Sequence, residues 1–201
     1  MSRSQLLSKA SLLIKTHGFT REALARSVLG FEGHTEPLSD TAVSSLFGRG
    51  DEARKTLIQA WLDEGRLEMR SGKTSGLKGI LQTRLEYNKP AFALLASTER
   101  GFPPLDPRPA LRHAATVADE ALYISGDTSL QLEWYTQRAS IAAVYSAAEL
   151  HQLTSPETAP AFLDSLLDGS FALKNTLGEV QLFSGHIFKS WQGILKSKGI
   201  L

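Results

Sequence analysis

The chain has 201 residues, of which 42% are hydrophobic and 21% charged, and its net charge is +1. This composition is that of a folded protein with a sizeable core, and it excludes a disordered or fibrous chain. Because the sequence contains no cysteine, disulfides, thiolate metal sites and a cysteine nucleophile are excluded. No apolar run approaches the roughly 18 residues of a membrane span, so we expect any membrane contact to be peripheral.

The charges are unevenly distributed along the chain. Residues 1–21 carry four basic side chains and no acidic one, and residues 177–201 carry three lysines against one glutamate. The segment between them has 15 basic and 20 acidic residues. Proteins that bind nucleic acid concentrate positive charge on the surface that meets the phosphates. An acidic middle segment therefore argues against a nucleic-acid-binding body.

The chain begins with a pattern typical of an amphipathic helix that ends at His17-Gly18. The first twenty residues are also basic, contain serine and lack acids, as mitochondrial transit peptides do. A second helix signal follows directly after Gly18, which favours the helix over the transit peptide. The expected apolar face of this helix is formed by Leu6, Ala10, Leu13 and Ile14.

Capping residues predict the next three helices. Thr20 caps a helix that ends near Leu29, and Ser39 caps the short segment DTAVSSLF, which Gly48 and Gly50 end. A longer helix starts at Asp51 and runs through TLIQAWLDEGRLEM.

Proline and glycine punctuate the following segments. After the linker SGKTSG, a helix over GLKGILQTRLEYN is expected to stop before Pro90, and AFALLAS is expected to form a separate short helix. A proline-rich turn, RGFPPLDPRP, precedes a helix whose first turn suits Pro107 and which ends near Gly126.

Two further helices follow. Asp127 or Thr128 is expected to cap a helix to about Leu153, and SPETAPAFLDSLLDGSFAL is expected to be the penultimate helix. No alternating β-pattern of useful length and no internal repeat are present. The sequence therefore predicts an all-α fold of about ten helices, divided into a head (residues 1–60), a body (61–175) and a C-terminal amphipathic helix (176–201).

The sequence contains none of the catalytic motifs that its local patterns suggest. SGKTSG lacks the leading glycine of a phosphate loop, since that position is Leu67, and no strand precedes it. The five histidines are scattered without HExxH or Glu-x-x-His spacing, and there is no GxSxG elbow. We therefore expect neither an enzyme nor a metal site.

Residues 4–60 have the layout of a TetR-like DNA-binding head, in which the third helix would enter the major groove. Leu38–Phe47 would be this recognition helix, yet it contains no lysine or arginine. Glu32, Glu36 and Asp40 lead into it, whereas phosphate contacts require basic side chains. The helix-turn-helix is therefore interpreted as degenerate, and a TetR-type ligand-responsive transcription regulator is the alternative reading.

The C-terminal segment has an apolar helical face flanked by lysines, a pattern of interfacial membrane helices. Gly178, Gly185 and Gly193 weaken the helix by up to about 1 kcal/mol each, which suits a segment that orders on docking. The alternative is a terminal helix packed on its own domain or on a second protomer. The candidate membrane-binding residues are Val180, Phe183, Ile187, Phe188, Trp191, Ile194, Leu195, Lys189, Lys196 and Lys198.

The stretch GDTSLQLEWYTQRASIAAVYSAAEL, residues 126–150, places Trp and Arg at the head of a helix and small residues after them. Trp and Arg are typical anchors of interaction surfaces. Together with the His17-Gly18 head and the glycine-punctuated tail, the pattern GD-x3-LxxWYTxRAxIAAVYSxAEL resembles the Coq nine family of ubiquinone-biosynthesis proteins. The similarity covers nearly the whole chain and is strongest from Asp119 to Leu150. Ala121 departs from it, because the family often has a large residue before the Gly-Asp turn.

The resemblance implies a TetR-like homodimer without nucleic-acid binding, peripheral on the matrix side of the mitochondrial inner membrane. It implies no catalytic cofactor but a bound lipid, an isoprenoid quinone intermediate or a phospholipid, with membrane lipids such as cardiolipin as further partners. It also implies that the di-iron demethoxyubiquinone hydroxylase (Coq seven), within a wider Q-synthesis complex, does the chemistry. Carried onto this sequence, the partner-facing residues are Trp134, Tyr135, Arg138, Asp127 and Leu130.

Four side-chain roles are expected within this framework. Arg138 lies one helical turn after Trp134, close enough to brace the indole by a cation–π contact. Tyr145 and Glu149 are interpreted as structural, with Glu149 buried and paired. Close helix packing is expected at Ala139, Ala142, Ala143 and Ala147, and the candidate lipid-lining residues are Trp61, Phe92, Leu95 and Leu122.

Overall fold

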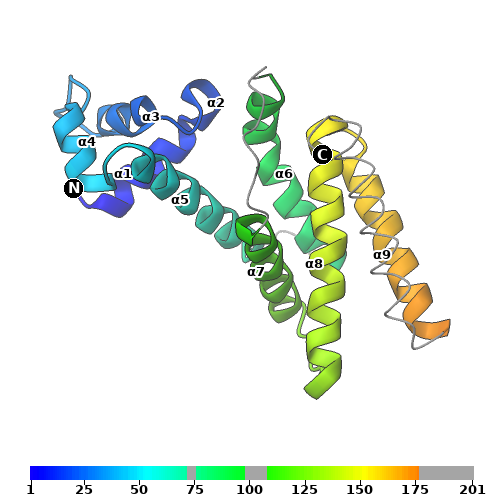
Figure 1. The fold of residues 1–201 in the computed structure, drawn as a ribbon. Coiled ribbons are helices and arrows are strands. Elements are labelled where there is room, and N and C mark those ends of the chain that lie inside the picture. Colours follow the sequence, from blue (N-terminus) through cyan, green and yellow to red (C-terminus); the bar gives the residue numbers. More distant parts are fainter. Residues whose placement is uncertain (72–75, 98–107, 177–201) are drawn as a thin grey trace.

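The computed structural model describes residues 1–71, 76–97 and 108–176, which are helical with short connections and contain no strand (Figure 1). The all-α prediction is therefore confirmed. The described elements are α1 (Arg3–Leu12), α2 (Ile14–His17), α3 (Arg21–Arg26), the 3₁₀ turn η1 (Ser27–Gly30), α4 (Asp40–Phe47), α5 (Asp51–Met69), α6 (Gly76–Ser97), α7 (Arg108–Ile124), α8 (Gln131–Thr154) and α9 (Ala159–Thr176).

The head consists of α1 to α4 packed against the first part of α5. Its helices begin where the capping residues predict: the Thr20 hydroxyl accepts the amide hydrogen of Ala23, and the Ser39 hydroxyl accepts that of Ala42. The predicted apolar face of the first segment is largely confirmed, because Leu6, Ala10 and Ile14 are buried while Leu13 is half-buried at the break between α1 and α2.

The body packs α6, α7, α8 and α9 around a second apolar core. Figure 1 shows α5 running from the head to the body, with α8 beside α7 and α9 on the outer side of α8. Two helices contribute to both apolar clusters. Helix α5 contributes Trp61 to the head cluster and Met69 to the body cluster, and α6 contributes Ala91 to the head cluster and Leu85 to the body cluster. These two long helices therefore connect head and body.

The prediction that a helix stops before Pro90 is wrong. Helix α6 continues through Pro90 to Ser97 and so includes the segment expected to be a separate short helix. A proline inside a helix removes one hydrogen bond and clashes with the carbonyl four residues back. Packing outweighs this cost here, because Ala91 is fully buried and Tyr87 and Phe92 pack against the head cluster.

The predicted cap of the long helix is also wrong. Helix α8 begins at Gln131, and the residue in the N-cap position is Leu130, with φ −125° and ψ 156°. Gly126 takes φ 77°, a left-handed conformation that favours glycine, and directs the chain from α7 into the turn. Asp127 and Thr128 therefore lie in the turn, too early to cap α8.

The C-terminal amphipathic segment lies outside the described residues, except for Thr176 at the end of α9. Its ten candidate membrane-binding residues therefore remain a prediction from the sequence. None of the described helices has the length and apolarity needed to cross a membrane.

Candidate functional site

One end of α8 exposes large apolar side chains to solvent. Leu130 is 77% exposed, Tyr135 67% and Trp134 37%. We call these three residues the aromatic patch. The rings of Trp134 and Tyr135 meet edge to face, with their centroids 4.7 Å apart. Exposed aromatic side chains grouped in this way are typical of an interaction surface.

Arg138 holds the indole of Trp134 in place. Its guanidinium carbon lies 3.8 Å from the centre of the Trp134 ring, which confirms the predicted cation–π contact. Two carboxylates fix the guanidinium: Nε donates to Asp119 at 2.7 Å, and Nη1 donates to Asp127 at 3.1 Å. The Arg138 side chain is only 15% exposed. Its charge is already paired within the chain, so its role is to position Trp134 rather than to offer a free cation.

Asp127 organises the turn that precedes α8. Its carboxylate accepts the Ser129 hydroxyl at 2.7 Å and the Ser129 amide hydrogen at 3.2 Å, in addition to Arg138. The hydrogen bond from the Ser129 hydroxyl lowers the pKa of Asp127, and the backbone amide and Arg138 lower it further against the opposing effect of burial. The ionised carboxylate therefore ties the turn to the body of α8, in place of the predicted cap.

The structure thus brings all five predicted partner-facing residues to one end of α8. The four alanines that were expected to pack closely behind these residues are buried only in part. Ala147 is buried, Ala142 and Ala143 are half-buried, and Ala139 is exposed. Ala121 is fully buried in the body core, so it lies beneath the surface rather than within the aromatic patch.

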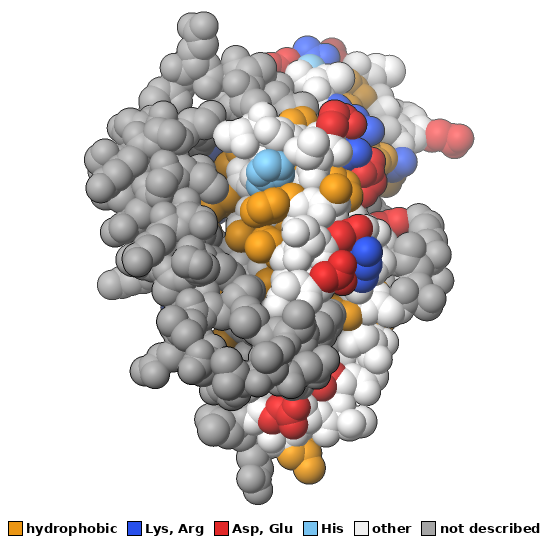
Figure 2. Space-filling model, turned by 90° about the vertical axis from the view of Figure 1, so that its right-hand side faces the viewer, with side chains coloured by type: hydrophobic (Ala, Val, Ile, Leu, Met, Phe, Trp, Pro, Cys, Tyr) orange, Lys and Arg blue, Asp and Glu red, His pale blue; other side chains and the backbone are white. Residues whose placement is uncertain are grey.

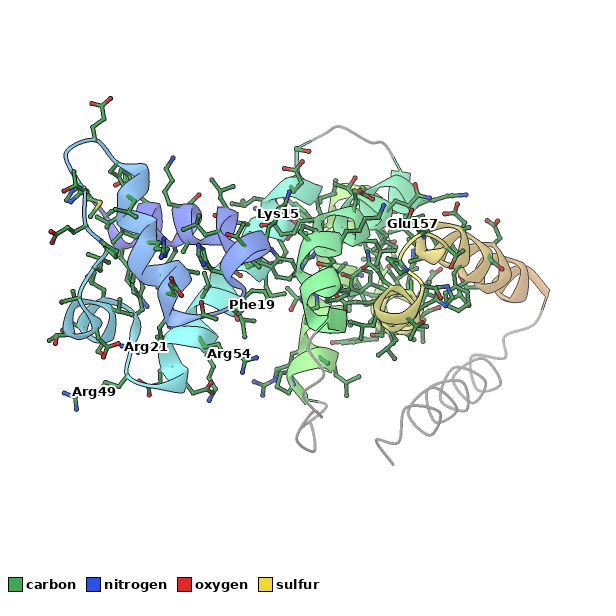
Figure 3. All side chains as sticks on the ribbon, turned by 90° about the horizontal axis from the view of Figure 1, so that it is seen from above. Lys15, Phe19, Arg21, Arg49, Arg54 and Glu157 are labelled. Atoms are coloured by element: carbon green, nitrogen blue, oxygen red, sulfur yellow. The ribbon has the colours of Figure 1, made fainter. Side chains whose placement is uncertain are left out.

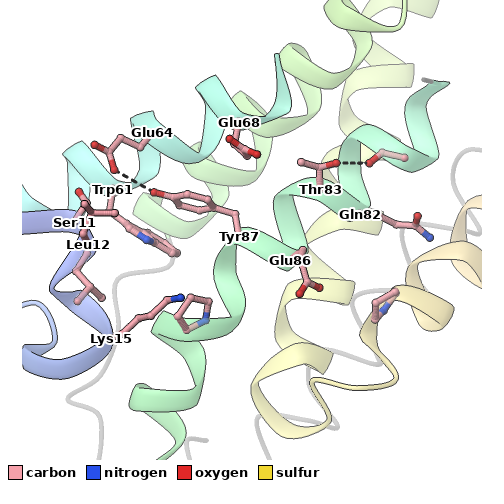
Figure 4. Close-up of a pocket in the computed structure, with 14 residues that line it drawn as sticks. Ser11, Leu12, Lys15, Trp61, Glu64, Glu68, Gln82, Thr83, Glu86 and Tyr87 are labelled. Atoms are coloured by element: carbon pink, nitrogen blue, oxygen red, sulfur yellow. Dashed lines mark hydrogen bonds between the residues drawn. The ribbon is translucent and has the colours of Figure 1, made fainter. Parts of the chain in front are cut away.

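A groove of about 850 Å³ lies between the head and α6 (Figure 4). We call it the α5–α6 groove. The helices α1, α2, α5 and α6 and the first turn of α9 form its walls. The lining residues are Ser11, Leu12, Ile14, Lys15, Trp61, Glu64, Glu68, Gly79, Gln82, Thr83, Glu86, Tyr87, Pro90 and Pro160.

Aromatic rings form the wall of this groove. Trp61 and Tyr87 have ring centroids 5.3 Å apart, and Phe19 meets Trp61 edge to face at 5.5 Å. The Tyr87 hydroxyl donates to Glu64 at 3.2 Å, as Figure 4 shows. Burial, followed by the charge of Glu64, raises the pKa of Tyr87, so the hydroxyl remains protonated.

A buried polar network joins α6 to α7 and α8. Arg84 is fully buried and donates to Asn88 at 2.6 Å, and Asn88 donates to Glu149 at 2.8 Å. The Tyr145 hydroxyl donates to the same Glu149 oxygen at 3.0 Å, and His113 Nε2 lies 3.3 Å from it. The expected structural role of Tyr145 and Glu149 is confirmed.

Opposite influences act on the pKa of Glu149. Burial alone would raise it, but His113, Arg84 and the Tyr145 hydroxyl together outweigh burial and lower it. Sequence reasoning missed Arg84. The available signal was its position one turn from Ile80, Leu81 and Asn88 on the buried face of α6, where a basic side chain requires a partner.

Comparison with known proteins points to the segment that carries the aromatic patch. A family model described as COQ9 matches residues 108–174, which span α7, α8 and most of α9. Ubiquinone biosynthesis protein COQ9, mitochondrial, of Drosophila melanogaster is 27% identical over 201 residues, covering 89% of this chain and 58% of the relative. The chain is similar to COQ9 proteins over most of its length.

Other relatives show the same similarity. Ubiquinone biosynthesis protein coq9, mitochondrial, of Schizosaccharomyces pombe is 35% identical over 101 residues, covering 48% of this chain and 40% of the relative. The Bos taurus COQ9 protein is 28% identical over 204 residues, covering 88% of this chain and 60% of the relative. The chain thus spans between 40% and 60% of the length of these three relatives.

The four candidate lipid-lining residues are not brought to one place. Trp61 lines the α5–α6 groove, and Phe92 is half-buried against the head cluster. Leu122 is 1% exposed and belongs to the apolar cluster of the body. It is therefore not among the residues that line the groove. The side chain of Leu95 lies outside the described residues.

Three basic side chains near α4, Arg21, Arg54 and Lys55, lie beside acids. Arg21 donates to Asp40 at 2.7 Å, and Lys55 lies 3.4 Å from Asp51. Figure 3 shows Arg49 projecting from the outer end of the head, with Lys15 and Phe19 on the side toward the body. Among the described residues, no group of three or more histidines or acids could hold a metal ion.

Proposed function

We propose that this chain is a non-catalytic accessory protein of ubiquinone biosynthesis that presents polyprenyl quinone intermediates to the di-iron demethoxyubiquinone hydroxylase. Its relatives carry the name ubiquinone biosynthesis protein. The hydroxylase supplies the oxidative chemistry in this proposal, and the present chain supplies a docking surface and a lipid. The observation that carries the proposal is the aromatic patch, because Arg138 fixes Trp134 in an exposed position before any partner binds.

The physical advantage of this arrangement is preorganisation. A side chain that is already ordered loses less conformational entropy on binding, and immobilising a free one costs roughly 0.5–1.5 kcal/mol. Trp134 is held by its ring contact with Tyr135 and by Arg138, which is itself anchored by Asp119. The patch therefore resembles the aromatic anchors that dominate the energetics of protein interfaces.

Lipid handling and membrane attachment complete the proposal. A polyprenyl tail is nearly insoluble in water, and each CH₂ removed from water contributes about 0.8 kcal/mol, so a carrier needs an apolar surface to bind it. Peripheral attachment to the matrix side of the mitochondrial inner membrane is assigned to residues 176–201, through an apolar face flanked by lysines. The relatives are named as mitochondrial, which supports a mitochondrial location.

A homodimer through α8 and α9 is part of the same proposal. Figure 2 shows hydrophobic side chains gathered around a histidine in the middle of one face, with charged side chains beside them. Half-buried Phe162 stacks on His151 at a centroid distance of 4.5 Å, and Leu166 is half-buried on the same helix as Phe162. These side chains offer apolar area for a second protomer. We propose no nucleic-acid binding, because α4 itself carries no lysine or arginine and Arg21, Arg54 and Lys55 near it lie beside acids.

The deciding experiment measures binding of the purified hydroxylase by biolayer interferometry. Trp134→Ala and Tyr135→Ala should each weaken binding about tenfold or more, because aromatic anchors contribute 2 kcal/mol or more at interfaces. Leu67→Ala is the matched control, since Leu67 is 62% exposed on α5 and remote in sequence from the patch. Equal affinity of all three variants and the unmodified chain would contradict the proposal.

A second experiment tests the membrane role. The full chain is compared in liposome flotation with a chain ending at Thr176, which keeps α9 intact. Cardiolipin-containing vesicles should float the full chain and not the shorter one, and mass spectrometry should find co-purified isoprenoid lipid. Flotation of neither chain, without bound lipid, would exclude the lipid-presenting role and would direct attention to salt-dependent DNA binding.

A further inference from the structure

We propose that the docking surface for the hydroxylase continues from α8 onto α7 through Tyr123, and that it fits an apolar face of the partner rather than a charged one. The inference rests on the proposed function, because the partner is the same hydroxylase. Tyr123 is not among the five partner-facing residues predicted from the sequence. It is 77% exposed, which makes it the most exposed aromatic side chain in the described part of the chain.

The pairing of α7 with α8 places Tyr123 beside the aromatic patch. The short turn over residues 125–130 joins the two helices, so they run antiparallel and side by side (Figure 1). The ion pair between Asp119 and Arg138 sets their register. Tyr123 follows Asp119 by four residues, and Trp134 precedes Arg138 by four residues. Because residues four apart share one side of a helix, Tyr123 on α7 lies level with Trp134 on α8 and on the same side.

The charges on either side of Tyr123 are paired within the chain. Asp119 is engaged by Arg138 at 2.7 Å, and Arg70 of α5 donates to Glu120 at 2.7 Å. The hydrogen bond to Glu120 is the largest effect that raises the pKa of Arg70, and the neighbouring Tyr123 adds to the rise. Tyr123 therefore stands between two ion pairs whose charges are already neutralised.

A surface with these properties favours apolar contact. The cores of protein interfaces are depleted in charged residues and enriched in Tyr and Trp. The ion pairs around Tyr123 offer a partner little net charge, whereas the exposed side chains offer a large apolar area. The face of the hydroxylase that meets them is therefore apolar. The large side chains on the extended surface are Tyr123, Leu130, Trp134 and Tyr135.

Interferometry with the purified hydroxylase tests the contact at Tyr123. Tyr123→Ala should weaken binding about tenfold or more, because aromatic anchors dominate the energetics of interfaces. Tyr123→Phe should stay within about twofold of the unmodified chain, since the ring supplies most of the contact area. Leu111→Ala is the matched control and should leave the affinity unchanged. Leu111 is 54% exposed on the same helix, and it lies about 18 Å from Tyr123 along the axis.

The same measurements separate this inference from the proposed function. Weaker binding of Trp134→Ala together with unchanged binding of Tyr123→Ala would overturn the extension onto α7 and leave the proposed function standing. Unchanged binding of both variants would overturn both. Circular dichroism melting curves verify that each variant is folded, which is expected because both side chains are exposed.

The salt dependence of dissociation tests the apolar character of the contact. Salt acts on unpaired charges, and long-range charge effects appear mainly in the association rate. The dissociation rate should therefore change less than about threefold between about 50 mM and about 500 mM salt. Dissociation that accelerates about tenfold or more over this range would show that charged contacts hold the complex, and would overturn this part of the proposal.

Two other occupants of the surface around Tyr123 give different results. A second copy of the chain would make Tyr123→Ala lower the dimer fraction in sedimentation velocity without the hydroxylase. A membrane would make Tyr123→Ala reduce flotation with cardiolipin-containing vesicles. We expect neither change, and either one would overturn the assignment of Tyr123 to the hydroxylase.

Discussion

The guanidinium of Arg84 fills the space that a side chain at Gly65 would occupy. A Cβ placed on Gly65 would stand 2.6 Å from Arg84 Cζ and 2.9 Å from Tyr87 Cδ1. Gly65 lies in the middle of α5, where glycine is about 1 kcal/mol less favourable than alanine. Close approach of the buried arginine on α6 is the physical reason for a glycine at this helical position.

Gly65→Ala should therefore destabilise the protein, against the intrinsic preference of a helix for alanine. The added methyl group must displace Arg84 or Tyr87 in a packed interior, and such overpacking costs about 1–3 kcal/mol. Urea denaturation measures the free energy of unfolding. Gly169→Ala on α9 is the matched control, because a Cβ there meets no described atom within 4 Å, and it should stabilise by up to about 1 kcal/mol. Stabilisation by both substitutions would contradict this account.

Leu130→Ser should change stability and binding in opposite directions. Leu130 occupies the N-cap position of α8, and its apolar side chain cannot accept a hydrogen bond from the first turn. Serine at an N-cap stabilises a helix by about 0.5–2 kcal/mol relative to residues that do not cap. Docking of the hydroxylase should weaken, since Leu130 is part of the aromatic patch. Thermal unfolding and interferometry on the same sample measure the two effects, and weaker binding without a gain in stability would refute the capping argument.

Arg138→Lys should weaken docking while keeping the positive charge. Lysine lacks the planar guanidinium that stacks on Trp134 and donates separately to Asp119 and Asp127. The indole then gains freedom, which must be lost again on binding, so the affinity for the hydroxylase should fall about three- to tenfold. Arg112→Lys, on the exposed face of α7, is the control and should have no effect. An unchanged affinity for Arg138→Lys would show that charge alone suffices.

Glu149→Gln should reduce the dependence of stability on acid pH. The pKa of Glu149 is lowered in the folded protein, so its contribution to stability is present above the unfolded value of about 4.3 and is lost as pH falls through the folded pKa. The variant should lose about 1–3 kcal/mol at pH 7, because His113 and Asn88 lose an ionised partner. Urea denaturation between neutral and acid pH should then show a shallower decline than in the unmodified chain. Parallel declines would contradict the assignment, and Glu36→Gln serves as control.

Local signals in the sequence predict most of the helical boundaries. Thr20, Ser39 and Asp51 are followed by helices as expected, because a cap or a first-turn acid acts within a few residues of the chain. The sequence also predicted that the five partner-facing residues lie close together, because four of them fall within residues 130–138, at the start of α8. The brace of Trp134 by Arg138 was predictable because the two residues are one turn apart.

The errors arise where contacts between distant segments outweigh local preference. Pro90 lies inside a continuous helix because the surrounding residues of α6 are held by the head and the body at once. Asp127 does not cap α8 because Ser129 and Arg138 take its carboxylate. A short window of sequence cannot predict either outcome, because the stabilising contacts at Pro90 and Asp127 form only when the helices pack together.

The sequence by itself thus determined an all-helical chain, the positions of most helix starts and the resemblance to COQ9 proteins, and that resemblance predicted the exposed Trp-Tyr pair. Only the tertiary structure decided that Arg84 is buried against Gly65, that Arg138 is neutralised by Asp119, and that Trp61 and Tyr87 share a groove with two glutamates. Helix starts follow from hydrogen bonds between near neighbours in the chain. Burial, charge pairing and cavities depend on the packing of α5, α6, α7 and α8 against one another, which brings together residues far apart in sequence.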